Sequence, residues 1–389
     1  TLPKAHMEFL QFSGRRVFVR GDMNLPVING RVQSHARLTA CAQTARALSA
    51  AGAKTVLMAH QGQKGEPDFI SLKGHAPLLE EACGKPVKFI DYSDMDKVRS
   101  LLTAMKNGDI ILLENVRFLD DETAKYQTPA DFAKSTLISK LGDLCDAFML
   151  DALSVAHREH ASVVGFSYIG KPTYMGPVLA REHAVIVGMR EGTLKQPVYF
   201  LLGGGKVMDS IAIVDKYGDK AALFVLGGLL ANYVLAAKGA NISLPRQESV
   251  GLLASAKNIL LPADLAYEKN GKREECSIQE ADGRAYFDIG SDSIAQFIKT
   301  LAKAGTIIIN GPQGAYENPM FAKGSIEVFR AIAASPSVCI FGGGDTNEVL
   351  EQNGIHLKEG DFASLSGKAF LLAITGEKLA GLELPFAEL

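Results

Sequence analysis

Short apolar runs, each about the length of one β-strand, alternate along this chain with segments of helical pattern. In the first half the runs are rich in β-forming residues and cover residues 17–20, 55–59, 87–90, 110–113 and 147–151. Helix-patterned stretches such as residues 37–51 and 76–83 lie between them. Strands that alternate with helices build a parallel sheet from repeated βα units. The first half is therefore predicted to form an α/β lobe.

The second half repeats the same alternation. Its predicted strands cover residues 198–202, 222–225, 306–309 and 338–341, and each is followed by glycine or by Asn-Gly-Pro and then by a candidate helix. Between the halves, residues 165–177 (GFSYIGKPTYMGP) concentrate glycine and proline, as a domain boundary does. We expect two Rossmann-like, doubly wound parallel-sheet lobes joined by a hinge, with the ligand site in a cleft between them.

The residues that follow the strands of the first half are strongly polar. Ligands of open α/β sheets gather beyond the carboxyl ends of the strands. These positions hold Arg20-Gly-Asp22-Met-Asn24, His60 to Gln63, Glu114 to Arg117, and Asp151 with His157-Arg158, and Arg37 opens the first helix. Any one of these arginines could form an ordinary surface ion pair. Their recurrence at one end of successive strands favours a site for a small polyanion.

The strands of the second half end instead in glycine. The segments are Gly203 to Lys206, Gly227-Gly228, Asn310 to Gly314 and Gly342 to Thr346. Glycine lets backbone N–H groups approach a phosphate closely, and a following helix N-terminus favours an anion, although tight turns also use glycine for conformational reasons alone. Residues 201–210 (LLGGGKVMDS) are not a P-loop, because Val207 follows Lys206. With Lys206 as a point charge and Asp345 as a magnesium ligand, these segments predict a nucleotide phosphate site.

Charge and cysteine content exclude several other classes of protein. A formal charge of −2 over 389 residues argues against a broad basic surface for nucleic acid. No stretch approaches about 18 uninterrupted apolar residues, and residues 1–10 lack an apolar signal segment. The five cysteines are widely spaced and form no CxxC pair, so neither a zinc site nor a disulfide framework is indicated. We expect a soluble cytoplasmic protein with no membrane or nucleic-acid partner.

Taken together, the motifs resemble those of the phosphoglycerate kinase family over nearly the whole chain. They are RGDMNLP, SHARLTACAQT, MAHQGQKG, LLENVRF, LDALSVAHREHAS, LLGGGKVMDS, NGPQGAYE with FAKGS, and FGGGDTNEVL, and their character is closer to the archaeal branch. The resemblance implies a phosphotransferase with a carboxyl acceptor, which moves a phosphoryl group between 1,3-bisphosphoglycerate and ADP in glycolysis and gluconeogenesis. It also implies that Mg²⁺ accompanies the nucleotide, that the other partners are small molecules, and that the protein is a monomer or a homodimer.

The resemblance further implies which substrate each of the two lobes binds. Residues 1–170, joined by a tail of about residues 370–389 that crosses back, would form the lobe that binds the acid, and residues 171–369 would form the nucleotide lobe. Asp22 and Asn24 would hold the hydroxyacid end of phosphoglycerate, with Arg37 beside the reacting carboxylate. The distal phosphate would contact His60, Gln63, Arg117 and Arg158.

The same resemblance assigns the residues of the nucleotide lobe. Lys206 would contact the transferring phosphoryl group, Glu317 would reach the ribose, and Asp345 would bind the metal. Adenine would lie around Gly227, Gly228 and Pro312. The remaining nucleotide contacts would be Gly204, Gly205, Asn310, Gly342, Gly343, Gly344 and Thr346.

The chain departs from the family pattern at three places. Gln63 stands where the family has an arginine, which removes a cationic contact that neighbouring Lys64 replaces only in part. Ser210 stands where the family has a second lysine. Ser366-Gly367-Lys368 stands where the family has three glycines that donate N–H groups to the moving phosphoryl group. We expect Gly367 and Lys368 to act in catalysis, with the charge of Lys368 in place of the glycine amides.

Two other readings remain open at this stage. Gln63 would also suit a kinase of the same fold that phosphorylates a different carboxylate. The altered tail would also suit a nucleotide-binding protein without turnover, although Arg37, Lys206 and Asp345 together speak against that reading.

Overall fold

The computed structural model describes residues 9–389, which form two compact units. Unit 1 runs to Val185 and resumes over Lys378–Leu389, and unit 2 is Ile186–Glu377. Helix α8 (Pro177–Glu191) carries the chain from unit 1 into unit 2. No helix in the described part of the chain is both long enough and apolar enough to cross a membrane.

Unit 1 is built on a seven-stranded sheet with the strand order β18-β8-β7-β1-β4-β6-β5, and every pairing in it is parallel. Its strands are β1 (Arg16–Arg20), β4 (Lys54–Met58), β5 (Lys88–Ile90), β6 (Ile110–Leu113), β7 (Ala147–Leu150), β8 (Thr173–Met175) and β18 (Phe386–Ala387), and a small hairpin joins β2 (Val27–Ile28) to β3 (Arg31–Val32). Its helices are α2 (Ala36–Ala50), α3 (His75–Cys83), α4 (Met95–Thr103), α5 (Thr136–Leu141), α6 (Leu153–Ala156) and α7 (Phe166–Tyr168).

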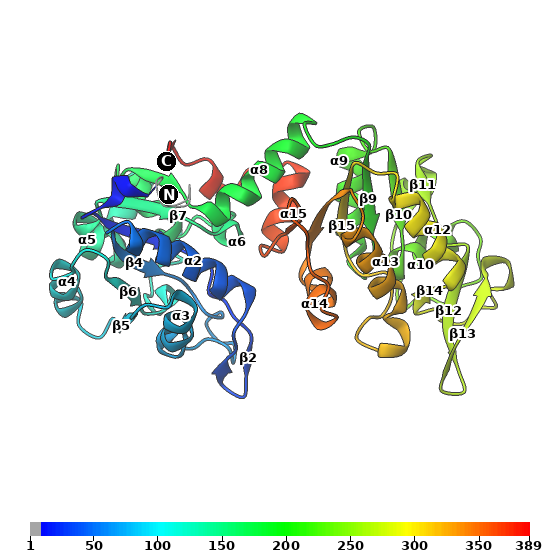
Figure 1. The fold of residues 1–389 in the computed structure, drawn as a ribbon, viewed down its shortest axis with the longest axis horizontal. Coiled ribbons are helices and arrows are strands. Elements are labelled where there is room, and N and C mark those ends of the chain that lie inside the picture. Colours follow the sequence, from blue (N-terminus) through cyan, green and yellow to red (C-terminus); the bar gives the residue numbers. More distant parts are fainter. Residues whose placement is uncertain (1–8) are drawn as a thin grey trace. The chain divides into compact units, whose positions relative to one another are not determined.

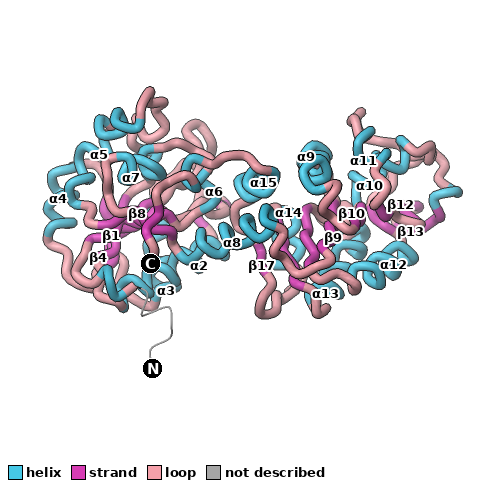
Figure 2. The backbone as a smooth tube through the Cα atoms, turned by 90° about the horizontal axis from the view of Figure 1, so that it is seen from above, coloured by secondary structure: helices cyan, strands magenta, loops and turns pink. Residues whose placement is uncertain are grey.

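Helices cover both faces of this sheet, as Figure 2 shows for α2 and α3 on one side and α5 and α7 on the other. The alternation of side chains along β1 explains the two layers. Val17 and Val19 belong to the core that includes the buried residues of α2 and α3. Phe18 points the other way, and its ring centroid lies 5.1 Å from that of Phe166 in α7. A strand buried on both faces must read as a continuous apolar run, which is what the sequence contains.

Unit 2 has the same construction, with a six-stranded parallel sheet in the order β11-β10-β9-β15-β16-β17. Figure 1 labels β9, β10, β11 and β15 of this sheet. The strands are β9 (Val198–Leu202), β10 (Leu223–Leu226), β11 (Ile259–Leu260), β15 (Thr306–Asn310), β16 (Val338–Gly342) and β17 (Phe362–Ala363), and a separate antiparallel sheet contains β12 (Asp264–Lys269), β13 (Lys272–Ser277) and β14 (Asp288–Ile289). The helices are α9 (Val207–Tyr217), α10 (Gly228–Ala237), α11 (Gly251–Ser255), α12 (Ser291–Leu301), α13 (Lys323–Ala333), α14 (Gly344–Gln352) and α15 (Lys368–Thr375).

The predicted fold class is confirmed, including the C-terminal tail that returns to unit 1, where β18 pairs with β8. The units divide later in the chain than residues 170 and 370, where glycine and proline content and the resemblance had placed the boundaries. Strand β8 belongs to unit 1 because it pairs with β7. Helix α15 belongs to unit 2, where the Tyr217 hydroxyl of α9 donates to the Ile374 carbonyl.

The start of α8 depends on one buried carboxylate, Asp151, which directly follows β7. Its Oδ1 accepts hydrogen bonds from the backbone N–H groups of Val178 at 2.8 Å and Leu179 at 3.2 Å. Its Oδ2 accepts from the Thr44 hydroxyl at 2.5 Å. A Cβ on Gly176 would lie 2.2 Å from this carboxylate, so only glycine fits there. Asp151 thus supplies the acceptor that the first turn of α8 lacks within the helix.

We predict that Asp151→Asn changes how stability depends on pH. Burial raises the pKa of Asp151 from an ordinary 3.8 to about 6, against the opposing effect of the Thr44 hydroxyl. The folded state therefore binds this proton more tightly than the unfolded state, and the free energy of unfolding falls as pH rises from about 4 to about 7, by up to about 3 kcal/mol. Asparagine carries no charge, its oxygen can keep the two bonds from α8, and its amide N–H can donate to the Thr44 hydroxyl oxygen. Urea unfolding at pH 4.5 and 7.5 should show wild type losing stability relative to the variant, and a pH-independent difference would contradict this account.

Candidate functional site

The first part of the site lies at the carboxyl ends of β1 and β4 in unit 1, where Asp22, Asn24 and Arg37 are held together. Arg37 Nε lies 3.2 Å from Asp22 Oδ2, and Arg37 Nη1 donates to the Asn24 carbonyl at 2.8 Å. The Ser154 hydroxyl donates to the same Asp22 oxygen at 2.7 Å. The Asn24 side-chain oxygen accepts from Gly62 N–H at 2.9 Å, which ties the loop after β1 to the loop after β4. The sequence-predicted trio therefore forms one hydrogen-bonded group.

Beside this group, unit 1 concentrates positive charge. Buried His60 contacts Arg20 through its Nδ1, 3.0 Å from Arg20 Nη2. Burial lowers the pKa of His60 well below its ordinary value, and the charges of Arg20, Arg117 and Arg158 lower it further. Burial and the other two arginines also lower the pKa of Arg117 to about 10. Groups that perturb one another share one neighbourhood, and a surplus of positive charge there favours an anion.

Burial and the same three arginines lower the pKa of His160 to about 3, so this histidine belongs to the cluster too. His160 has no role in the sequence-based prediction, and Arg20 appears there only as one of the arginines that follow strands. A strand-end arginine cannot be recognised as buried from sequence alone, yet Arg20 is only 1% exposed.

Gln63 lies apart from this buried cluster. Its side chain is exposed, and its backbone carbonyl accepts from Glu66 N–H at 2.9 Å. Neighbouring Lys64 forms an ion pair with Asp120 at 3.2 Å, in which both side chains are largely exposed. Such a pair contributes little to stability and leaves Lys64 free to exchange partners.

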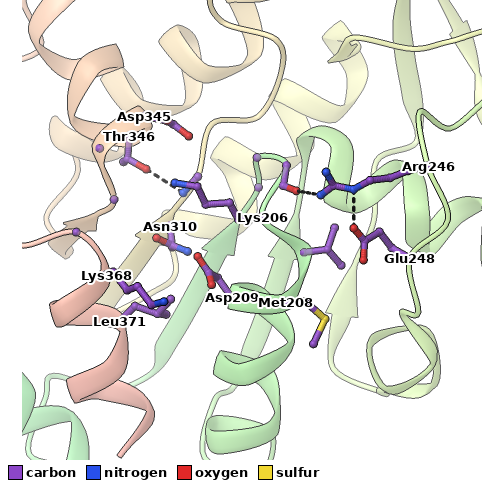
Figure 3. Close-up of a pocket in the computed structure, with 18 residues that line it drawn as sticks. Lys206, Met208, Asp209, Arg246, Glu248, Asn310, Asp345, Thr346, Lys368 and Leu371 are labelled. Atoms are coloured by element: carbon purple, nitrogen blue, oxygen red, sulfur yellow. Dashed lines mark hydrogen bonds and ion pairs between the residues drawn. The ribbon is translucent and has the colours of Figure 1, made fainter. Parts of the chain in front are cut away.

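The second part of the site is a cavity of about 450 Å³ in unit 2, shown in Figure 3. It brings together Lys206 at the start of α9, Asp345 in the first turn of α14 and Lys368 at the start of α15. Three helix N-termini therefore meet at one cavity, which is favourable for phosphate. The sequence-predicted residues that line it are Gly204, Gly205, Lys206, Asn310, Gly343, Gly344, Asp345, Thr346, Gly367 and Lys368.

The glycines around this cavity serve two different purposes. A Cβ on Gly203 would lie 2.1 Å from the Pro312 carbonyl, and one on Gly311 would lie 2.3 Å from the Gly203 carbonyl, so the loops pack too closely for side chains. At Gly344, in contrast, no atom would lie within 4 Å of an added Cβ. The first pair packs the loops together, whereas Gly344 keeps space open on the cavity side. Thr346 also joins the loops, since its Oγ1 accepts from Gly311 N–H at 2.8 Å.

A second cavity of about 380 Å³ adjoins the same loops through Gly204, Gly205 and Asp345. Its lining includes the predicted Pro312 and Glu317, and also Leu229 and the aromatic residues Tyr286, Phe287 and Tyr316. An apolar cavity with a carboxylate at its rim suits a flat heterocycle attached to a sugar.

Three glycines that were predicted to contact the nucleotide are buried by the glycine-rich loops and line neither cavity. Gly227 and Gly228 are buried, and a Cβ on Gly227 would lie 1.9 Å from the Gln313 side chain. Gly342 is buried at the end of β16, where it pairs with Asn310 of β15. These glycines position the loops.

Other residues that line the two cavities were not predicted from the sequence, and Arg246 is the most notable of them. Arg246 donates to the Gly205 carbonyl at 3.1 Å and pairs with Glu248 at 2.6 Å (Figure 3). It comes from a segment without secondary structure, and Tyr286 and Phe287 come from the approach to β14. None of these three residues follows a strand of the parallel sheet, and the site was predicted only from residues that do.

Comparisons with known proteins agree with this architecture. A sequence model of the family described as "Phosphoglycerate kinase" matches residues 7–377. The phosphoglycerate kinase of Halorubrum lacusprofundi is 34% identical over 386 residues, which cover 95% of this chain and 94% of that protein. The phosphoglycerate kinase of Akkermansia muciniphila is 35% identical over 401 residues, covering 98% and 97%. The crystal structure of phosphoglycerate kinase from Pyrococcus horikoshii gives a TM-score of 0.82 at 31% identity and covers 96% of each chain.

Two doubly wound units, one with cationic strand ends and one with glycine-rich loops around a phosphate-sized cavity, define a two-lobed kinase. The family match and the similar proteins identify the chain more narrowly than its fold does. The chain belongs to the phosphoglycerate kinase family. The resemblance seen in the sequence motifs is confirmed, and so is its archaeal character, since archaeal proteins are prominent among the relatives.

We predict that Gly344→Ala weakens nucleotide binding without harming the fold. The added methyl group meets no protein atom and occupies space on the cavity side, so the dissociation constant for nucleotide should rise about tenfold. Gly344 does not have a positive φ, so alanine fits its backbone conformation. Calorimetric titration and thermal unfolding check the two halves of the prediction.

Gly203→Ala is the matched comparison. Its methyl group would overlap the Pro312 carbonyl, so the variant should lose about 3 kcal/mol of stability or fail to fold. If Gly344→Ala bound nucleotide as tightly as wild type, the loop before α14 would not be a phosphate site.

Proposed function

We infer that the chain catalyses the reversible transfer of a phosphoryl group between 1,3-bisphosphoglycerate and ADP, which yields 3-phosphoglycerate and ATP. The observation that carries this function is the meeting of Lys206, Asp345 and Lys368 at one cavity bounded by glycine-rich loops. Family membership over most of the chain supports the same reaction.

We propose that unit 1 binds the acid and unit 2 binds the nucleotide. The hydrogen-bonded group of Asp22, Asn24 and Arg37 suits a hydroxyacid, and Arg37 provides the guanidinium for its carboxylate. The distal phosphate lies beside His60 and the cations Arg117 and Arg158. The second cavity of unit 2 takes the base, with Glu317 at the ribose.

The chemistry needs positioning more than it needs a general base. The carboxylate of phosphoglycerate is already ionised at pH 7, so no residue has to remove a proton from it. The barrier comes from the alignment of two anions and from the charge on the migrating group. Arg37 on the acid and Lys206 on the phosphoryl group neutralise charge, and Lys368 adds a cation from the start of α15.

The residues of unit 2 also fit a magnesium ion that arrives with the nucleotide. Mg²⁺ is usually held by one or two carboxylates together with substrate phosphates and water, and it does not need a protein cage. Asp345 lines the cavity at the first turn of α14, and residues 9–389 contain no cluster of three or more potential metal ligands. Asp345 would hold the ion, which neutralises phosphate charge when bound. The free thiols of all five cysteines support a cytoplasmic location, and we propose small molecules as the partners.

Steady-state phosphorylation of 3-phosphoglycerate by magnesium-ATP tests this function. Turnover of about 1 to 1,000 per second is expected, and Lys206→Ala should lower it at least about 100-fold because the migrating group loses its fixed cation. Lys257→Ala, an exposed lysine of unit 2 that does not line either cavity, should leave turnover unchanged. Nucleotide binding without turnover on this acid would favour a different carboxylate substrate or a binding protein.

Lys368 tests whether the altered tail takes part in transfer. We predict that Lys368→Ala lowers kcat about 10- to 100-fold and changes the dissociation constant for magnesium-ADP less than about twofold, because its charge acts on the transferring group. Lys368→Arg keeps the charge and should recover part of the activity, whereas Lys378→Ala removes an exposed lysine nearby in the sequence and serves as the control. An unaltered kcat in Lys368→Ala would show that this residue has no catalytic role.

A further inference from the structure

Behind the cationic cluster of unit 1 lies a buried chain of hydrogen bonds that the reaction described above does not use. Its members are Glu122, Ser162, Arg20 and His60, and each is at most 5% exposed. The Ser162 hydroxyl donates to Glu122 Oε1 at 2.5 Å and accepts from Arg20 Nε at 2.8 Å. Arg20 Nη2 lies 3.0 Å from His60 Nδ1. Four separate segments of the chain therefore meet in one line that ends at the histidine.

The direction of the last hydrogen bond fixes the protonation of His60. Arginine has only donors and stays charged, so the partner atom must accept. His60 Nδ1 can accept only when it carries no proton, which places the proton of the neutral ring on Nε2. The surrounding Arg20, Arg117 and Arg158 disfavour a second proton, in agreement with the lowered pKa of His60. His60 is then a neutral donor, and Nε2–H is its remaining hydrogen-bonding group.

Glu122 supplies the negative charge at the other end of the chain. It is fully buried, and Ser162 also donates to it through its backbone N–H at 3.1 Å from Oε2. Burial raises the pKa of Glu122 to about 7, while the bonds from Ser162 and the charge of Arg20 oppose the rise. A buried guanidinium without such a partner would be strongly unfavourable, above all next to Arg117 and Arg158.

We propose that Glu122 is a positioning residue for the anion site: through Ser162 and Arg20 it holds His60 as the Nε2–H tautomer, a neutral donor to the phosphate group bound beside Arg117 and Arg158. The identity of that anion as the distal phosphate of the acid rests on the proposed function. The hydrogen-bonded chain itself does not, so the two can fail separately.

Glu122→Gln tests the proposal with the smallest change of shape. Glutamine keeps an oxygen that accepts from Ser162 but carries no charge, so Arg20 should no longer be fixed against His60. The ¹⁵N NMR signals of the His60 ring should change from a single Nε2–H form to a mixture of tautomers. The dissociation constant for inorganic phosphate should rise about tenfold, since a hydrogen bond to a charged group is lost from the site. In turnover, KM for 3-phosphoglycerate should rise similarly, and KM for magnesium-ATP should stay within twofold.

Two further variants separate positioning from general stability. Glu114→Gln changes another buried carboxylate, which accepts from the Ser71 hydroxyl and from the backbone N–H groups of Leu72 and Asn115. This variant should leave the tautomer of His60 unchanged. Ser162→Ala removes the hydroxyl between Glu122 and Arg20, and it should change the His60 signals in the same direction as Glu122→Gln. It serves as the test variant if Glu122→Gln does not fold.

The outcomes are distinct. A changed tautomer together with weakened phosphate binding supports the proposal, even if wild type proves inactive on 3-phosphoglycerate and the proposed function fails. A wild-type tautomer and wild-type phosphate affinity in the folded Glu122→Gln or Ser162→Ala variant overturn the proposal. A changed tautomer with unchanged phosphate affinity also overturns it, because His60 would then not serve the anion site.

Discussion

Parallel pairing of the strands is the constraint on which both parts of the site depend. In unit 1, β1 lies between β4 and β7, with Arg20 paired to Met58 and Leu150. In unit 2, β15 lies between β9 and β16, with Asn310 paired to Leu202 and Gly342. In each case the three strands end together, so the segments that follow them meet at one edge of the sheet. The paired ends Arg20 and Leu150, and Leu202 and Asn310, are each more than 100 residues apart in sequence.

The two units meet the requirements of anion binding by opposite means. Unit 1 uses arginine side chains, which repel one another, beside the buried side chains of His60 and Glu122. Unit 2 uses loops packed so closely that Gly203 and Gly311 have no room for a Cβ. The cluster of unit 1 is therefore sensitive to a change of charge, and the loops of unit 2 are sensitive to a change of side-chain volume.

The sequence was sufficient for the main strands and for most of the residues that line the larger cavity of unit 2, because apolar strands buried on two faces and the glycine segments after them are local signals. It did not reveal β8 or β18, since β8 lies in a stretch rich in glycine and proline and β18 is formed only by pairing with it. The sequence also did not show which polar residues and glycines are buried. Arg20 resembled a surface arginine, and Gly227 and Gly228 resembled a base-binding loop, until the packing of Gln313 above them was known.

The charge around the larger cavity of unit 2 explains why a nucleotide would need its metal here. Three cations, Lys206, Arg246 and Lys368, line the cavity together with three carboxylates, Asp209, Glu248 and Asp345. Their formal charges cancel, so these side chains alone offer no net attraction to a polyphosphate. What remains is the field of three helix N-termini and the charge of a metal ion carried with the phosphates. Unit 1 differs, because its cluster is cationic before any ligand binds, and this charge favours an anion without the help of a metal.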